Sequence, residues 1–131
     1  MKKICILILF VAIPVFAAEE GSSWTCEGVS SIGFYWRDGS WENQAFAPTN
    51  YLFTVGADRG GTLIFSGYQW TFDNCVSSNI VRCSTNVGNA IVMNLSTGEG
   101  AVSSIIATAV PPEGEEAQTF MERVQCTRVG D

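Results

Sequence analysis

The chain has 131 residues, of which 7 are basic and 13 are acidic, so its formal net charge is −6. This length fits one domain, and the acidic balance argues against binding to nucleic acid, which needs clustered lysine and arginine. There is no histidine, which removes the usual general base at neutral pH and the Ser-His and Cys-His nucleophile pairs.

The N-terminus has the three parts of a secretory signal peptide: a basic start, an apolar stretch and a small-residue exit. Lys2 and Lys3 precede the apolar run, and Ala17 follows it. The run is roughly thirteen residues long, shorter than the ~20 that cross a bilayer, so no membrane span is expected. We predict a signal peptide over residues 1–17 and one mature domain over residues 18–131, in the periplasm or secreted.

Removal of the signal peptide changes the charge of the chain. Without Lys2 and Lys3, five arginines and no lysine stand against 13 acidic residues, so the mature net charge is −8. This excess of negative charge favours solubility and, where a protein partner exists, a basic one. The protein itself is expected to be a monomer.

The mature chain keeps an even number of cysteines, because Cys5 leaves with the signal peptide. In an oxidising compartment such a set predicts two disulfides. The four cysteines are Cys26, Cys75, Cys83 and Cys126. They contain no CxxC pair, and no histidine could complete a zinc shell. We therefore expect neither a metal nor a cofactor.

The clearest predicted element is a hairpin of residues 32–37 and 40–46. Asp38-Gly39 lies between these two aromatic runs, and both central residues of a type I′ turn need positive φ. A two-residue loop pairs Trp36 with Trp41 in the closer, non-hydrogen-bonded kind of pair, so the indoles can stack. The same face receives Ile32 and Phe34, and the opposite face receives Tyr35, Glu42 and Gln44.

Short runs rich in aromatic and β-branched residues recur along the rest of the chain, each closed by Gly, Asp, Asn or Pro, which indicates successive strands. The expected strands are residues 51–55, 62–65, 68–72, 90–95, 101–110 and 119–129. Residues 75–83 are expected to form a tight reversal, and residues 111–116 an acidic loop.

The fold class expected from this pattern is all-β. A meander of about eight short strands must hide its edges, and closing on itself is the most economical way. We therefore predict a small antiparallel up-and-down barrel, with a two-sheet β-sandwich as the alternative. In a barrel the first and last strands are neighbours, which would pair Cys26 with Cys126 and leave Cys75 for Cys83. Four cysteines permit three pairings, so the other two stay open.

Aromatic side chains are the main candidates for a binding surface. They either fill the barrel or form a recognition patch or a ligand cavity, since a barrel of about eight strands can hold one small ligand. The aromatic residues in question are Tyr35, Trp36, Trp41, Tyr51, Tyr68 and Trp70. The candidate binding surface comprises Tyr35, Trp36, Trp41 and Trp70, together with Glu113, Glu115 and Glu116 of the acidic loop.

Catalysis could act only through paired carboxylates, because a glycosidase needs two acids across a cleft. The candidates are Glu27, Asp38, Glu42, Asp58 and Asp73. Most of them fall at expected turns or on solvent-facing positions. We therefore expect no enzymatic activity, and a glycan-acting enzyme is kept as an alternative.

Two stretches of the chain carry a resemblance to known proteins. The first set of residues is Cys26, Gly33-Phe34-Tyr35-Trp36, Gly39-Ser40-Trp41, Phe46, Tyr51-Leu52, Phe72-Asp73-Asn74-Cys75, Val81-Arg82-Cys83 and Asn94-Leu95. Over most of the mature chain this set resembles a group of small exported bacterial proteins of unassigned function. The second stretch, Trp24-Thr25-Cys26-Glu27, is similar to the opening of the periplasmic inhibitors of C-type lysozyme.

Those inhibitors are small disulfide-bonded β-barrels that act on a very basic enzyme. The present sequence has no recognisable copy of their inhibitory loop, so no inhibitory residue transfers to it. The residues predict a non-enzymatic exported binding protein whose partner is a basic protein or a small ligand in the barrel. The resemblance implies, as the alternative, a periplasmic inhibitor of a basic cell-wall hydrolase such as lysozyme.

Overall fold

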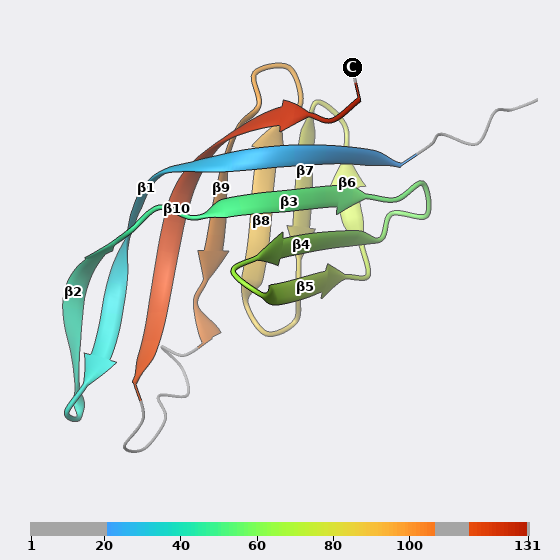
Figure 1. Ribbon diagram of the computed structural model, residues 1–131. Coiled ribbons are helices and arrows are strands. Elements are labelled where there is room, and N and C mark those ends of the chain that lie inside the picture. The colour runs from blue at the N-terminus through green and yellow to red at the C-terminus, as the bar shows by residue number, and fades with distance from the viewer. Residues whose placement is uncertain (1–20, 107–115, 131) are drawn as a thin grey trace, which may run out of the picture.

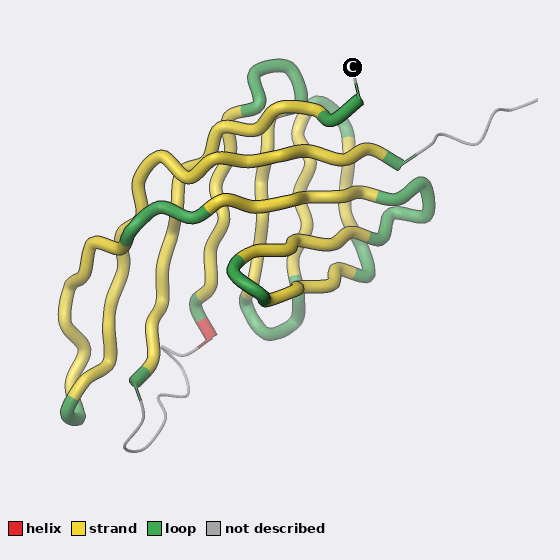
Figure 2. The backbone as a smooth tube through the Cα atoms, viewed as in Figure 1, coloured by secondary structure: helices red, strands yellow, loops and turns green. Residues whose placement is uncertain are grey.

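The computed structural model describes residues 21–106 and 116–130, which are almost entirely strand and turn (Figure 1, Figure 2). The strands are β1 (Ser22–Arg37), β2 (Ser40–Phe46), β3 (Asn50–Val55), β4 (Gly61–Phe65), β5 (Tyr68–Phe72), β6 (Cys75–Ser77), β7 (Ile80–Ser84), β8 (Asn89–Asn94), β9 (Glu99–Ser104) and β10 (Ala117–Arg128). The expected signal peptide, together with Glu113 and Glu115, lies outside the described residues. None of the residues described belongs to a helix long and apolar enough to cross a membrane.

The strands form one antiparallel sheet that curls into a nearly closed barrel. Around the barrel the order is β5-β4-β3-β1-β10-β9-β8-β7-β6, and β2 is an extra strand paired with β1. The predicted antiparallel barrel is therefore confirmed, and β1 and β10 are neighbours, as the closure argument required.

The remaining gap in the barrel lies between β5 and β6, which follow each other in the chain. At this gap the Cys75 N–H donates a hydrogen bond of 2.6 Å to Arg59 O, which ties β6 to the turn between β3 and β4. Figure 1 shows β3, β4 and β5 crossing β7, β8 and β9 at a steep angle. In such an orthogonal arrangement, long strands bend from one sheet into the other.

The strand that turns this corner is β1. Its first part, Ser22–Glu27, pairs with β3, its last part, Ser31–Arg37, pairs with β2, and β10 runs beside both. The register with β10 shifts between Gly28 and Ser30, and such a β-bulge bends a strand. Beyond the bend a three-stranded extension projects from the barrel (Figure 1). We call it the arm; it comprises residues 31–37 of β1, all of β2 and residues 117–121 of β10.

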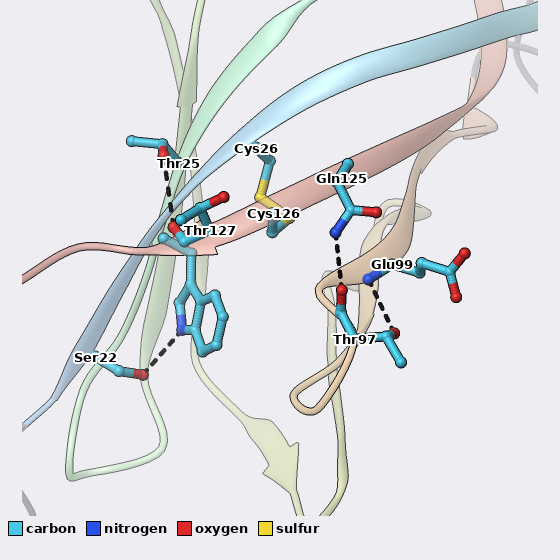
Figure 3. Close-up of a disulfide and its surroundings, with 9 residues drawn as sticks. Ser22, Thr25, Cys26, Thr97, Glu99, Gln125, Cys126 and Thr127 are labelled. Carbon is cyan, nitrogen blue, oxygen red and sulfur yellow. Dashed lines mark hydrogen bonds between the residues drawn. A yellow bond between two sulfur atoms is a disulfide. The ribbon is translucent and has the colours of Figure 1, made fainter. Parts of the chain in front are cut away.

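The barrel interior is filled by apolar side chains and by both disulfides. The largest interior side chains, each at most 1 % exposed, are Phe53, Leu63, Phe72, Ile91, Met93 and Val102. Cys26 lies opposite Cys126 on β1 and β10, and Cys75 lies opposite Cys83 on β6 and β7. Each opposed pair is bridged, so the predicted connectivity is confirmed. Figure 3 shows the Cys26–Cys126 bridge.

Strand β9 ends earlier than predicted. The sequence pattern carried this strand to residue 110, and residues 107–110 lie outside the described residues. The last paired residue is Ser104, which lies opposite Asn89, the first residue of β8. The Ile105 N–H instead donates to Gly88 O, at 3.3 Å, in the turn that precedes β8. The sequence did not reveal this end of the strand, because Ile105 and Ile106 continue the run of apolar residues. In the structure these two side chains are 60 % and 42 % exposed.

Candidate functional site

The arm presents two chemically different faces. Side chains alternate along a strand, so the register of β1 with β2 and β10 assigns each residue to one face. The outer face, which points away from the barrel interior, is uncharged and comprises Ile32, Phe34, Trp36, Trp41, Asn43, Ala45, Ala117, Thr119 and Met121. The inner face continues the barrel interior and includes Gly33, Tyr35, Glu42, Gln44, Gln118 and Phe120.

The predicted hairpin forms the end of the arm. Asp38 and Gly39 have φ values of 50° and 82°, as a type I′ turn needs. Trp36 lies opposite Trp41, with ring centroids 5.3 Å apart and an interplanar angle of 60°. The pairing is confirmed, but the two indoles are tilted against each other and not stacked. Ile32, on the same face, is 60 % exposed.

The inner face of the arm carries an aromatic and acidic cluster near its end. The Tyr35 hydroxyl donates a hydrogen bond to the Glu116 carboxylate. This hydrogen bond raises the pKa of Tyr35, since the carboxylate favours the protonated phenol. The Arg37 guanidinium lies 4.9 Å from the centroid of the Tyr35 ring. Of the three acidic-loop glutamates, Glu116 is thus placed beside Tyr35.

Where the inner face meets the barrel, it forms one wall of a pocket of about 290 Å³. The opposite wall is the turn between β4 and β5. The lining residues are Ser31, Phe46, Ala47, Thr49, Tyr51, Phe65, Ser66, Tyr68, Gln118, Phe120 and Glu122. Five of the eleven are aromatic, and Trp70 packs behind them at 4.9 Å from Phe65 and 6.4 Å from Phe120. We call this the mouth pocket.

Glu122 is the polar centre of the mouth pocket and is only 2 % exposed. Among the described residues it is the only buried side chain that carries a charged group. Its Oε1 atom accepts the Thr49 N–H at 2.7 Å. Burial raises the pKa of the neighbouring Tyr51, and the charge and hydrogen bonding of Glu122 raise it further.

Glu122 was missed by the sequence analysis, although β10 carried a signal. The inward-facing residues of this strand include Phe120, Val124 and Cys126, and Glu122 falls on the same alternation. A charged residue at an inward-facing position of a strand, where the other inward-facing residues are apolar, is expected to be buried. A buried charge needs a hydrogen-bond partner or an opposite charge to stabilise it.

The aromatic residues singled out in the sequence divide between the two faces. Trp36 and Trp41 are on the outer face of the arm, whereas Tyr35 is on the inner face. Tyr51, Tyr68 and Trp70 belong to the mouth pocket and its wall. Only Tyr51 is buried, at 4 % exposure; the barrel interior proper takes its aromatic side chains from Trp24, Phe53 and Phe72.

The five candidate catalytic carboxylates are mostly scattered. Asp58 and Asp73 are the exception, because both line one shallow depression beside β4. Asp58 is already used structurally, since its Oδ1 accepts the Gly60 N–H at 3.0 Å and closes the turn between β3 and β4. Asp38 is in the hairpin turn, Glu42 is on the arm, and Glu27 is exposed on β1.

The fold and these sites define a small two-disulfide antiparallel barrel with a projecting arm and an aromatic pocket that contains a carboxyl group. No protein-family model, curated protein or solved structure matches this chain.

Proposed function

We propose that this chain is an exported, non-enzymatic binding protein that accepts a cationic group of its target in the mouth pocket. The observation that carries the proposal is the Glu122 carboxyl group, 2 % exposed, beneath a set of aromatic rings. A cation is attracted to the face of an aromatic ring within about 6 Å of its centroid. A carboxylate behind the rings adds Coulomb attraction that water screens only weakly.

The inner face of the arm, which leads to the mouth pocket, also favours a positively charged group. Glu116, Glu42 and Arg37 lie on or beside the inner face of the arm, whereas the outer face carries no charge. With two carboxylates against one guanidinium, the inner face has an excess of negative charge, which favours the approach of a positive group. A target of this kind is an amine, a quaternary ammonium compound, or the lysine and arginine side chains of a basic protein.

Titration with tetramethylammonium tests the pocket directly. We expect this cation to shift the NMR signals of Tyr68 and Phe120, whereas tert-butanol, a neutral molecule of similar shape, should leave them unchanged. Tyr68→Ala should weaken binding of the cation, because Tyr68 is 67 % exposed at the rim and its ring can be removed without disturbing the core. Phe34→Ala, which removes an exposed ring from the outer face, is the matched control.

A basic protein target is tested with lysozyme in a cell-wall clearing assay. We expect inhibition at low salt that weakens at high salt, because screening acts over about 8 Å at physiological ionic strength. A variant with Glu113, Glu115 and Glu116 changed to glutamine should associate more slowly. Failure of both tetramethylammonium and lysozyme to bind would overturn the proposal, and binding of the cation alone would restrict the target to small molecules.

A second candidate function, a glycan-acting enzyme with paired carboxylates, is favoured by one observation. Asp58 and Asp73 line the same depression. The test is incubation with cell-wall glycans, with Asp58→Asn and Asp73→Asn as variants and Glu27→Gln as the control. Cleavage that disappears in either aspartate variant but persists in the control would replace the binding proposal.

A further inference from the structure

Strand β2 has a free edge. It pairs with β1 from Ser40 to Phe46, and within the described ranges no strand pairs with its other side. In a two-residue hairpin, the pair that flanks the turn is hydrogen-bonded, and the pairs then alternate. Arg37–Ser40 is that first pair. The backbone N–H and C=O groups of Trp41, Asn43 and Ala45 therefore point away from β1.

This edge lacks the features that usually protect an exposed strand. Such edges commonly carry lysine, proline, a β-bulge or several charges. Residues 40–46 have no lysine or proline and a single charge, Glu42. The pairing with β1 runs over the whole strand without a register shift. The edge is therefore regular, nearly neutral and suited to pairing with another strand.

We propose that two copies of this chain associate through their β2 edges, antiparallel, about a two-fold axis at Asn43. A two-fold contact requires that the surface be complementary to itself. With the axis at Asn43, Trp41 lies opposite Ala45 of the second copy, and Asn43 lies opposite Asn43. All three residues with outward backbone groups are then hydrogen-bonded across the interface.

Neighbouring registers satisfy these conditions less well. An axis at Glu42 places the two Glu42 carboxylates opposite each other, and like charges in that position are destabilising. An axis at Gln44 moves Trp41 beyond the end of the opposing strand, which stops at Phe46. The axis at Asn43 instead places Glu42 opposite Gln44, whose amide can donate to the carboxylate.

The side chains of the outer face support the same register. Trp41 and Ala45 lie on that face beside Trp36 and Ile32 of β1. Two copies would join their outer faces into one continuous, uncharged surface in which each Trp41 indole packs beside Ala45 of the second copy. The small alanine leaves room for the ring. This dimer would replace the monomer expected from the sequence.

Sedimentation equilibrium of the oxidised chain tests the proposal. We expect a mass of two chains at high concentration, and a dissociation constant that falls as salt rises, because each mature copy carries a net charge of −8. Asn43→Pro should raise that constant at least about tenfold, because it removes an outward N–H while leaving the bonds to β1 intact. Asn43→Thr, which keeps the N–H, should leave the dimer in place.

A charge variant provides an independent check. Asn43→Lys would set two cations opposite each other across the axis and should separate the copies, whereas Asn86→Lys, in the exposed turn between β7 and β8, should not. Peptide mapping that finds both native disulfides in every variant shows that the fold is retained. A wild-type chain that stays monomeric at all concentrations, or a dimer insensitive to Asn43→Pro, would overturn the proposal.

Discussion

The carboxyl group of Glu122 occupies the space that any side chain at residue 28 would need. A Cβ atom on Gly28 would lie 2.1 Å from Glu122 Oε1 and 2.6 Å from Thr49 O. Glu122 Oε1 also accepts the Thr49 N–H, and the Gly28 N–H donates to Thr49 O at 2.9 Å. The bulge of β1, the connection between β2 and β3, and β10 are thus joined at one point. That point is where the arm leaves the barrel.

Gly28→Ala should therefore destabilise the protein by about 2–3 kcal/mol, the cost of forcing extra atoms into a packed site. The added Cβ meets backbone atoms of Thr49, which have little freedom to move. Urea unfolding measures the loss. Gly39→Ala is the control, since nothing lies within 4 Å of its Cβ position and only the positive φ of 82° opposes the change, at about 1 kcal/mol. Equal losses at the two glycines would contradict the close approach of Glu122.

Replacement of Glu122 should distinguish its charge from its hydrogen bonding. Glu122→Leu leaves the Thr49 N–H without its acceptor and removes the partner of Tyr51, which should cost about 2–4 kcal/mol. Glu122→Gln keeps an acceptor for Thr49 and should cost about 1 kcal/mol. In the double variant Glu122→Leu with Tyr51→Phe, the two losses should be less than additive. Strict additivity would show that the two side chains do not interact.

The alkaline stability of the protein should depend on Tyr51. Burial, followed by the charge of Glu122, raises its pKa above the ordinary value of 10.0. The raised pKa favours the folded protein with a neutral phenol, and this stabilisation is fully present below about pH 10. Above that pH the unfolded chain ionises Tyr51 while the folded protein does not. The free energy of unfolding should then fall by up to about 1.4 kcal/mol per pH unit.

Urea unfolding at several pH values above neutrality measures this effect. Tyr51→Phe should show a shallower loss, and the difference from wild type isolates Tyr51 from other tyrosines such as Tyr35. Identical alkaline slopes for the two proteins would mean that Tyr51 ionises as readily in the folded state as in the unfolded one.

The two disulfides should contribute unequally to stability. The Cys26–Cys126 bridge spans 100 residues and the Cys75–Cys83 bridge spans 8. In the chain-entropy account a closed loop of these sizes contributes about 4.7 and about 2.5 kcal/mol, as upper expectations. Paired changes to alanine, one bridge at a time, followed by urea unfolding, should show the larger loss for Cys26–Cys126. The reverse order would indicate that packing of the shorter bridge against β4 outweighs loop entropy.

Much of the barrel was predictable because its determinants are local. The Asp38-Gly39 dipeptide requires positive φ at both residues, and it therefore set the hairpin and the opposition of Trp36 and Trp41. Successive strands joined by short turns left no room for a crossover helix, so a meander that closes on itself followed. The pairing of Cys26 with Cys126 came from that closure, not from the spacing of the cysteines.

The mouth pocket was beyond sequence reasoning, for a different reason. Its residues come from β1, β2, β3, β4, β5 and β10, and from the connections between them, so no local pattern brings them together. How the residues of the mouth pocket come together depends on how far the bulge at Gly28 bends β1. The packing of Gly28 against Thr49 and Glu122 sets that bend.

By itself, the sequence determined the all-β class and the hairpin, because turn chemistry and period-2 alternation act between near neighbours, and the expected closure of the barrel gave the Cys26–Cys126 pairing. Only the tertiary structure decided that Glu122 is buried, that Tyr35 meets Glu116 and that β2 lies outside the barrel with a free edge. These features depend on contacts between strands far apart in the chain, and a one-residue bulge decides which of those strands meet.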